Sequence, residues 1–334
     1  MRKVVTGQVV AVAPSDASKA DGVESAEARV KTRLGRIVRP KRRWSQGSWW
    51  LYIVPGLVVV CVINLVPLVY SLYESFRVDL LSYPELHGFT TSNYVSTVTD
   101  PVVQQATVNT LIFTVVSVAI SLVAGMVLAL LVDGLRTGKR LFRTVFFMPM
   151  LMCSAVIGVE WRFLLNDQSG PITWLIHLAG LHISPLGSTS WSLVTVTLVD
   201  AWQWTPFVFL VLTAGLQAQP LEPLESARVD GANSWQMFRH ITLPSLYPLI
   251  GIAILFRVTW DFRGFSEIYT LTGGGPGYSS TLLGLRVYEY GWEILNVGAA
   301  EALSVLMVVL MGLLAGYILW SQYGKRRGPA SNAR

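Results

Sequence analysis

Ionisable side chains inside apolar segments are the first residues of this sequence that could take part in chemistry. Between residues 246 and 271, Arg257 and Asp261 lie four residues apart, and so do Arg263 and Glu267. On a helix, residues four apart share a face, so each pair could form an ion pair. A charge in lipid costs at least about 2.5–3.5 kcal/mol on insertion scales, so such groups should face a bundle interior or a water-filled path. Two interpretations stay open, namely ion pairs that hold helices together and a polar path for a hydroxyl-rich solute.

A second apolar segment carries the aromatic residues Trp202 and Trp204 with Gln203 between them, shortly before Pro206. A proline loosens a membrane helix, and aromatic faces can stack on sugar rings. The two tryptophans are about 200° apart around a helix, so we expect one to contact solute and the other to pack against lipid or a neighbouring helix. The candidate substrate-path residues are Trp202, Gln203, Trp204, Asp261, Arg263 and Glu267.

Catalytic, metal and nucleotide sites are not indicated by the sequence. The segment from Gly134 to Arg140 resembles a phosphate-binding loop, but its spacing is one residue short and no Ser or Thr follows Lys139. We therefore expect no catalytic residue, no metal and no cofactor in this chain, so that any ATP chemistry belongs to a partner. The histidines show no paired metal spacing; they are His87, His177, His182 and His240.

The elements that must position these residues are membrane spans. Hydrophobic residues make up 52% of the chain and charged residues 14%, against about 25% charged in soluble domains. The sequence predicts an all-α integral membrane protein with a basic N-terminal tail (1–47), a six-span domain (48–322) and a C-terminal tail (323–334). The predicted spans are Trp49–Leu72, Val108–Val132, Leu141–Leu165, Trp191–Leu216, Leu246–Leu271 and Ala299–Trp320.

The distribution of Lys and Arg predicts the orientation. Most of the 26 basic residues lie in the N-terminal tail, the connection between spans two and three, the 219–245 loop and the C-terminal tail. The connections on the other side contain only Arg77 and Arg286. Basic loops stay in the cytoplasm, so both termini and the 219–245 loop are predicted to be cytoplasmic. The net charge of +6 is thereby explained without a nucleic-acid partner.

The loop at 219–245 interrupts the apolar pattern and predicts two short helices joined by a turn. Pro220 suits the first turn of the first helix, and Asp230–Gly231 is a turn signal. Ser234 is predicted to cap the second helix, which should end before Pro244. On that helix Trp235, Phe238 and Ile241 are spaced three apart and form an apolar stripe, which needs a protein partner to bury it.

This loop closely resembles the EAA loop of ABC importer permeases. The resemblance rests on Glu225-Ser226-Ala227-x-x-Asp230-Gly231-Ala232 followed by Phe238, Ile241, Leu243-Pro244 and Pro248. In that family the loop is cytoplasmic and docks into a cleft on the ATP-hydrolysing subunit. Ser226 replaces the usual Ala, and its small size should preserve the fit. The residues implied to dock are Glu225, Ala227, Asp230, Gly231, Ala232, Trp235, Phe238 and Ile241.

A second signature narrows the resemblance. Residues 269–276, with Thr281 beyond them, are similar to the LTxGGP segment of carbohydrate permeases of the maltose and glycerol-3-phosphate type. The resemblance implies a non-catalytic permease subunit of an ATP-driven, binding-protein-dependent importer of a sugar or sugar derivative, in the inner (cytoplasmic) membrane. The implied partners are membrane lipid, a second six-span permease in a heterodimer, two ATP-binding subunits or an ATPase homodimer using ATP and Mg²⁺, and an extracytoplasmic solute-binding protein.

Two other classes remain open from the sequence. A secondary transporter driven by an ion gradient is also polytopic and also places charges in its spans. An integral membrane enzyme is the third class, which the lack of a clustered His, Cys or carboxylate site disfavours.

The predicted orientation can be tested with a reporter that is active only in the cytoplasm. Fusions after Arg140, Asn233 or Lys325 should be active, and fusions after Thr97, Gly180 or Tyr288 should be silent, because short basic loops resist translocation. A cytoplasmic signal from the Gly180 fusion would contradict the six-span arrangement.

Overall fold

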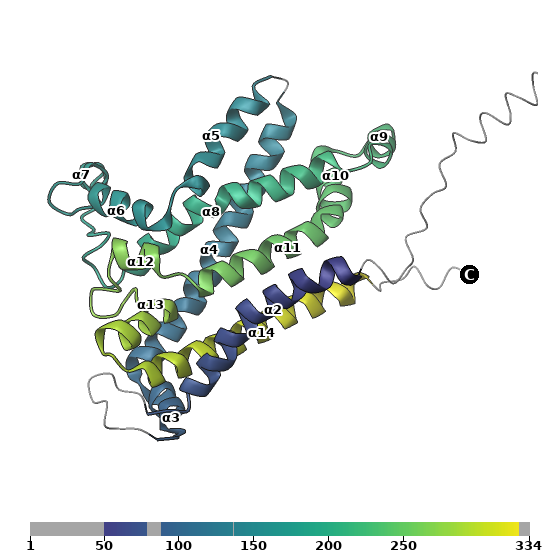
Figure 1. Cartoon of the computed structure of the whole chain (residues 1–334). Coiled ribbons are helices and arrows are strands. Elements are labelled where there is room, and N and C mark those ends of the chain that lie inside the picture. Colours follow the sequence, from purple (N-terminus) through teal and green to yellow (C-terminus); the bar gives the residue numbers. More distant parts are fainter. Residues whose placement is uncertain (1–49, 79–87, 136, 327–334) are drawn as a thin grey trace, which may run out of the picture. The chain divides into compact units, whose positions relative to one another are not determined.

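The computed structural model describes residues 50–78, 88–135 and 137–326. Within them the chain is helical, and its only β feature is an isolated bridge between Arg77 and Phe89 (Figure 1). The predicted tail at 1–47 and most of the predicted tail at 323–334 lie outside the described residues. The helices are α2 (Trp50–Glu74), α3 (Ser92–Thr99), α4 (Pro101–Gly134), α5 (Lys139–Leu151), α6 (Ser154–Leu164), α7 (Pro171–Leu178), α8 (Ser192–Gln217), α9 (Glu222–Val229), α10 (Ser234–Met237), η1 (Phe238–Thr242), α11 (Leu243–Phe262), α12 (Ser266–Leu271), α13 (Leu283–Tyr288), η2 (Glu289–Glu293) and α14 (Val297–Arg326).

Five helical segments of the described chain are long and apolar enough to cross a membrane, and a sixth span exists if α5 and α6 count as one broken span. The third span, predicted at Leu141–Leu165, is therefore not one straight helix, because α5 and α6 meet at 94°. Pro149 stands in the last turn of α5, where it removes a backbone donor, and Met152 and Cys153 are extended. The proline and the two extended residues therefore account for the break between α5 and α6.

The fifth span also ends earlier than predicted. The sequence placed it at Leu246–Leu271, but α11 ends at Phe262 and the short helix α12 begins at Ser266. Gly264 lies in the gap, where its amide donates to the Asp261 carbonyl at 3.1 Å. The apolar run continues across this gap, so hydropathy alone did not reveal the end of the helix.

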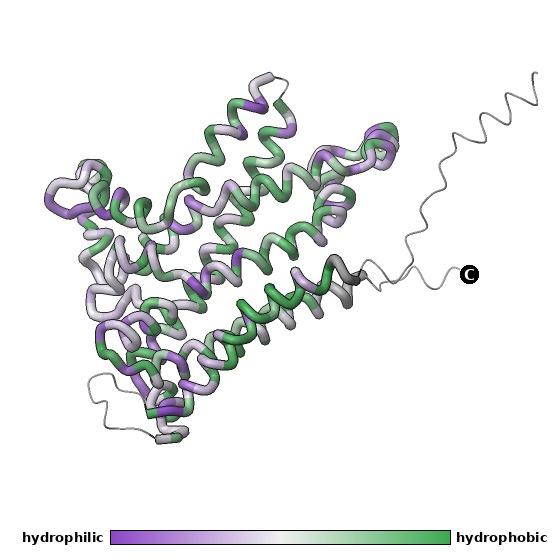
Figure 2. Tube along the Cα trace, in the orientation of Figure 1, coloured by the Kyte–Doolittle hydropathy of each residue, from purple (hydrophilic) through white to green (hydrophobic). Residues whose placement is uncertain are grey.

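The chain divides into two compact units at Asn64–Leu65, inside α2. In the first unit the described part of α2 has mostly exposed side chains from Ile53 onward. In the second unit α4, α8 and α11 pack on one another, and Figure 2 shows apolar colour along all three. Gly125 permits a close crossing of α4 and α8, since a Cβ there would lie 2.9 Å from Cβ of Val208. Small residues at helix crossings are typical of membrane bundles.

A polar network ties the start of α4 to α13 and η2. The Asp100 carboxylate caps α4 by accepting the Val102 N–H at 2.7 Å, and it accepts the Arg286 guanidinium at 2.8 Å and the Tyr290 hydroxyl. Burial opposes ionisation, but these hydrogen bonds outweigh it and lower the pKa of Asp100. Burial and the hydrogen bond to Asp100 raise the pKa of Tyr290 to about 12. Arg286 also pairs with Glu289 at 2.7 Å. Because Asp100 and Arg286 are 186 residues apart, the network joins segments that are distant in sequence.

Candidate functional site

The most buried charge of the described chain is Arg257, on α11. Its side chain is 0% exposed, and its Nη2 lies 2.5 Å from Oδ2 of Asp200 on α8 and 2.6 Å from Oγ of Ser117 on α4. The Ser117 hydroxyl also donates to Asp200. Arg257 Nη1 lies 3.0 Å from Oδ1 of Asp261, one turn later on α11. One guanidinium therefore joins the three helices that pack at the centre of the second unit.

The predicted pair of Arg257 and Asp261 is confirmed, whereas the predicted pair of Arg263 and Glu267 is wrong. Arg263 caps the end of α11 and is exposed, while Glu267 lies on the separate helix α12 and is 5% exposed. The four-residue spacing predicts a shared face only within one helix. The two charges thus have different environments.

Aromatic side chains cover one side of the buried Arg257. The Trp204 ring centroid lies 4.4 Å from that of Trp260 and 5.9 Å from the Arg257 guanidinium carbon. Phe207 packs edge-on against Trp260 at 5.0 Å. A cation held over an indole face is stabilised by about 0.5–2 kcal/mol. Trp204 therefore packs against Trp260 and Arg257 and is half-buried.

Trp202 points to a different environment. Its side chain is 43% exposed, and its ring meets Trp161 of α6 edge-on at 5.4 Å. Of the two tryptophans, it is the one available to a solute or a partner. This division agrees with the expectation that only one of them can line a path, although the path residues themselves stay a prediction.

Gln203, between the two tryptophans, is buried and bonds to the break between α5 and α6. Its amide nitrogen donates to the Met152 carbonyl at 3.3 Å and to Oγ of Ser154 at 3.1 Å. Backbone that leaves a helix at membrane depth must find such a partner. Of the predicted path residues, Gln203, Asp261 and Glu267 are buried within the single chain, so a solute could reach them only after a rearrangement.

The helix pair of the 219–245 loop forms as predicted, with three corrections of detail. Helix α9 begins at Glu222 with Pro223 near its start, so Pro220 precedes it. The cap of α10 is Asn233, which accepts the Gln236 N–H at 2.9 Å while the Gln236 side chain accepts the Asn233 N–H at 2.8 Å. Ser234 is instead the first helical residue. Asparagine caps at least as well as serine, and the Gln three residues later completes a capping box.

The third correction concerns the end of the second helix. The chain does not leave the helix before Pro244 but stays helical from Ser234 to Phe262. Pro244 lacks an N–H, and the preceding turn widens to a π-helix in which the Leu243 N–H donates to the Phe238 carbonyl. Gln219, just after α8, donates to the Thr242 carbonyl at 3.2 Å. The loop helix and the span are therefore one continuous element.

Gly231 makes the turn between α9 and α10. Its φ is +81°, and its N–H donates to the Arg228 carbonyl at 3.1 Å. The following Ala232 N–H donates to the Ala227 carbonyl at 2.9 Å. These two bonds form a Schellman motif, in which the glycine position requires a left-handed backbone. A Cβ there would meet no atom within 4 Å, so the requirement is conformational and not steric.

The surface of this turn is exposed and partly apolar. Trp235 is 65% exposed and Val229 is 88% exposed, and the Trp235 ring lies 5.6 Å from that of Phe238. Glu225 and Asp230 are also exposed, whereas Ala227, Ala232, Phe238 and Ile241 are half-buried. Figure 2 shows that hydrophilic colour collects around α9. Aromatic and aliphatic side chains exposed this fully are typical of an interface.

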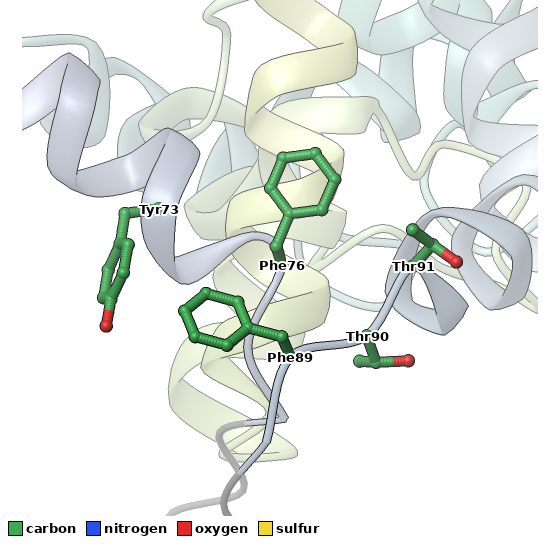
Figure 3. Close-up of a pocket in the computed structure, with 5 residues that line it drawn as sticks. All are labelled: Tyr73, Phe76, Phe89, Thr90 and Thr91. Atoms are coloured by element: carbon green, nitrogen blue, oxygen red, sulfur yellow. The ribbon is translucent and has the colours of Figure 1, made fainter.

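A separate pocket lies beside the end of α2 and includes none of the predicted site residues. It has a volume of about 640 Å³ and is lined by Tyr73, Phe76, Phe89, Thr90 and Thr91 (Figure 3). Tyr73 and Phe89 meet edge-on at 5.6 Å. Its described lining offers three aromatic rings and three hydroxyl groups and includes no charged side chain.

Comparison with known proteins identifies the family. The profile described as "Binding-protein-dependent transport system inner membrane component" matches residues 121–323. The chain belongs to this family. It is 33% identical to a probable ABC transporter permease protein of Sinorhizobium fredii over 88% of this chain and 95% of that protein. It is 30% identical to the trehalose/maltose transport system permease protein MalF of Thermococcus litoralis over 83% of this chain and 94% of that protein.

Two further similarities support the same assignment. The sn-glycerol-3-phosphate transport system permease protein UgpA of Agrobacterium fabrum is 28% identical over 80% of this chain and 92% of that protein. A chain in the crystal structure of a bacterial alginate ABC transporter with a periplasmic protein matches with a TM-score of 0.70, at 20% identity, over 81% of this chain and 92% of that chain. The permease fold predicted from the sequence is thus confirmed.

Sequence reasoning missed the roles of Asp200 and Ser117. Asp200 lies 57 residues before Arg257, and Ser117 lies 140 residues before it. The available signal was Asp200, the only charged residue in its predicted span, because a buried charge needs a partner. That signal does not identify which helices are neighbours.

Removing the buried cation should destabilise the protein. Arg257→Met leaves Asp200 and Asp261 buried without their counter-charge, and losing one partner of a buried ion pair costs about 3–5 kcal/mol. We expect a lower unfolding temperature of the purified complex and less protein in the membrane. The control is Arg162→Met, since Arg162 is exposed and makes one long hydrogen bond, 3.4 Å to the Thr270 carbonyl; its effect should stay within about 0.5 kcal/mol. Equal unfolding temperatures for the two variants would contradict this role of Arg257.

Proposed function

We propose that this family member is the permease subunit of an ATP-driven importer for a sugar or sugar derivative. Its relatives are named for transport of trehalose, maltose and sn-glycerol-3-phosphate. Residues 269–276 also resemble the LTxGGP segment of carbohydrate permeases. A second permease, ATP-binding subunits that use ATP and Mg²⁺, and an extracytoplasmic solute-binding protein complete the proposed transporter.

The helix pair α9–α10 is the proposed docking surface for the ATP-binding subunit. The observation that carries this proposal is the continuous helix from Ser234 to Phe262, which bears the exposed Trp235 at one end and the buried Arg257 near the other. A partner that moves Trp235 and Phe238 therefore moves the element that carries the central ion pair. Coupling requires such an element with two arrangements that ATP binding biases.

The proposed orientation follows from the same surface. ATP is a cytoplasmic solute, so the docking helices and both termini are placed in the cytoplasm, in agreement with the Lys and Arg distribution. Arg228 lies in the last turn of α9, just before the α9–α10 turn, and α5 begins with Lys139 and Arg140. The network of Asp100, Arg286 and Tyr290 then lies on the opposite, extracytoplasmic side.

The docking role predicts that transport depends on the backbone of Gly231. Gly231→Val should uncouple ATP hydrolysis from uptake, because a β-branched residue is strained at φ +81° and the Schellman motif would distort. Gly231→Asn is the matched control, since it also fills the open space beside the turn but tolerates the left-handed backbone. The measurement is ATP hydrolysis and uptake in proteoliposomes of the whole transporter, with co-purification of the ATPase. Wild-type uptake and ATPase binding by Gly231→Val would refute the docking role.

The solute path is tested by comparing the two tryptophans. Trp202→Ala should raise the concentration of labelled trehalose or maltose needed for half-maximal uptake, or abolish uptake, at unchanged membrane abundance, because Trp202 is exposed. Trp204→Ala should chiefly lower abundance, because it removes packing against Trp260 and Arg257. Uptake is normalised to inserted protein. Normal uptake by both variants after this correction would remove α8 from the path.

A further inference from the structure

A cavity of about 390 Å³ lies where α11 ends, between α11, α13 and α14. Its walls are almost entirely apolar, with Phe262 and Phe265 on one side and Met307 and Met311 of α14 on the other. The exceptions are Arg263 and Ser304, and the Ser304 hydroxyl already donates to the Ala300 carbonyl at 2.9 Å. The cavity therefore combines a long apolar wall with one available cation.

Arg263 stands at the polar end of this cavity. It is exposed, and no hydrogen bond or ion pair joins its side chain to another residue in the described part of the chain. The helix that contains α11 is continuous from Ser234 to Phe262, and it is long and apolar enough to cross a membrane. Since Arg263 follows its last residue, the guanidinium belongs at one face of the membrane.

The apolar wall leads away from that face. Ser304 and Met311 both line the cavity and lie seven residues apart on α14, about 10 Å along the helix axis. Further along, Met311, Leu314 and Ile318 pack with Val258 and Phe262 of α11. The lining thus runs from the cation along α14 as far as Met311, beyond which α11 and α14 pack against each other and close the cavity.

We propose that this cavity binds one phospholipid, with its phosphate on Arg263 and an acyl chain along Met307 and Met311. A guanidinium matches phosphate geometry and can make two parallel hydrogen bonds to it. Methionine side chains are flexible and polarisable, and they fit an irregular chain. A sugar would find almost no hydrogen-bonding partner here. A free phosphate could bind the guanidinium but would leave the apolar wall without an apolar ligand.

A close backbone contact between α13 and the end of α11 lies at the entrance of the cavity. A Cβ on Gly284 of α13 would lie 2.7 Å from the Gly264 carbonyl oxygen, so α13 crosses directly over the residue that follows Arg263. This contact holds the end of α11 against α13 and keeps the guanidinium at the entrance. The lipid would rest against α11, α13 and α14 together. The site does not depend on which solute is carried.

Photolabelling of the whole transporter in lipid nanodiscs tests the proposal. The probe is phosphatidylglycerol with a diazirine in its acyl chain, and labelled peptides are mapped by mass spectrometry. We expect labelling at Met307–Met311, and Arg263→Gln should lower it roughly tenfold, the factor that corresponds to one charge-assisted hydrogen bond. Arg263→Lys, which keeps the cation, should retain most of the labelling. Labelling that is the same for Arg263→Gln and the wild type would overturn the proposal.

A second pair of variants separates the cavity from the general lipid surface. Val308 lines the cavity and Val309 does not, and both are about equally exposed. Val308→Trp should fill the cavity and suppress labelling of Met311, while Val309→Trp should leave it unchanged. A benzophenone amino acid at Val308 should crosslink to lipid. Crosslinking to the second permease instead would show that a protein covers this surface, and the lipid proposal would fail.

Discussion

The packing of the second unit depends on the burial of the Arg257 guanidinium. A cation removed from water is destabilising unless carboxylates and hydroxyl groups surround it, and this one is met by Asp200, Asp261 and Ser117. These partners come from α4, α8 and α11, so the three helices are constrained in rotation and in height at the same point. Apolar packing is less specific in lipid, because hydrocarbon tails resemble leucine side chains. The ion pair therefore selects one arrangement among several of similar hydrophobic energy.

The same constraint links the two ends of a long helix. Ser234 to Phe262 is continuous despite Pro244, because the π-turn at 238–242 shifts the hydrogen bonds by one residue where the proline has no donor. Trp235 is exposed at the start of this helix and Arg257 is buried near its end. A rigid element that joins the proposed docking surface to a buried charge cluster is suited to transmit a displacement, since neither end can move without repacking the other.

Irregular backbone elsewhere in the bundle is stabilised by particular side chains. The break between α5 and α6 exposes the Met152 carbonyl, which Gln203 of α8 satisfies. Near α12, a Cβ on Gly158 would lie 2.8 Å from the Glu267 carbonyl oxygen, so glycine is needed for α6 to approach that helix. Non-helical segments are tolerated at membrane depth where such contacts exist. The exposed Trp202 meets the half-buried Trp161 of α6 just after this break.

Local patterns in the sequence determined much of this protein. Hydropathy located the apolar segments, Asp230–Gly231 located the turn that the φ of +81° confirms, and the spacing of Arg257 and Asp261 predicted their ion pair. Each depends on residues close in sequence. The tertiary structure alone decided that Asp200 and Ser117 meet Arg257, that Gln203 bonds to the α5–α6 break, and that Arg263 and Glu267 belong to different helices. Those outcomes depend on which helices are neighbours and where an apolar run stops being helical, and residue types along one segment do not encode either.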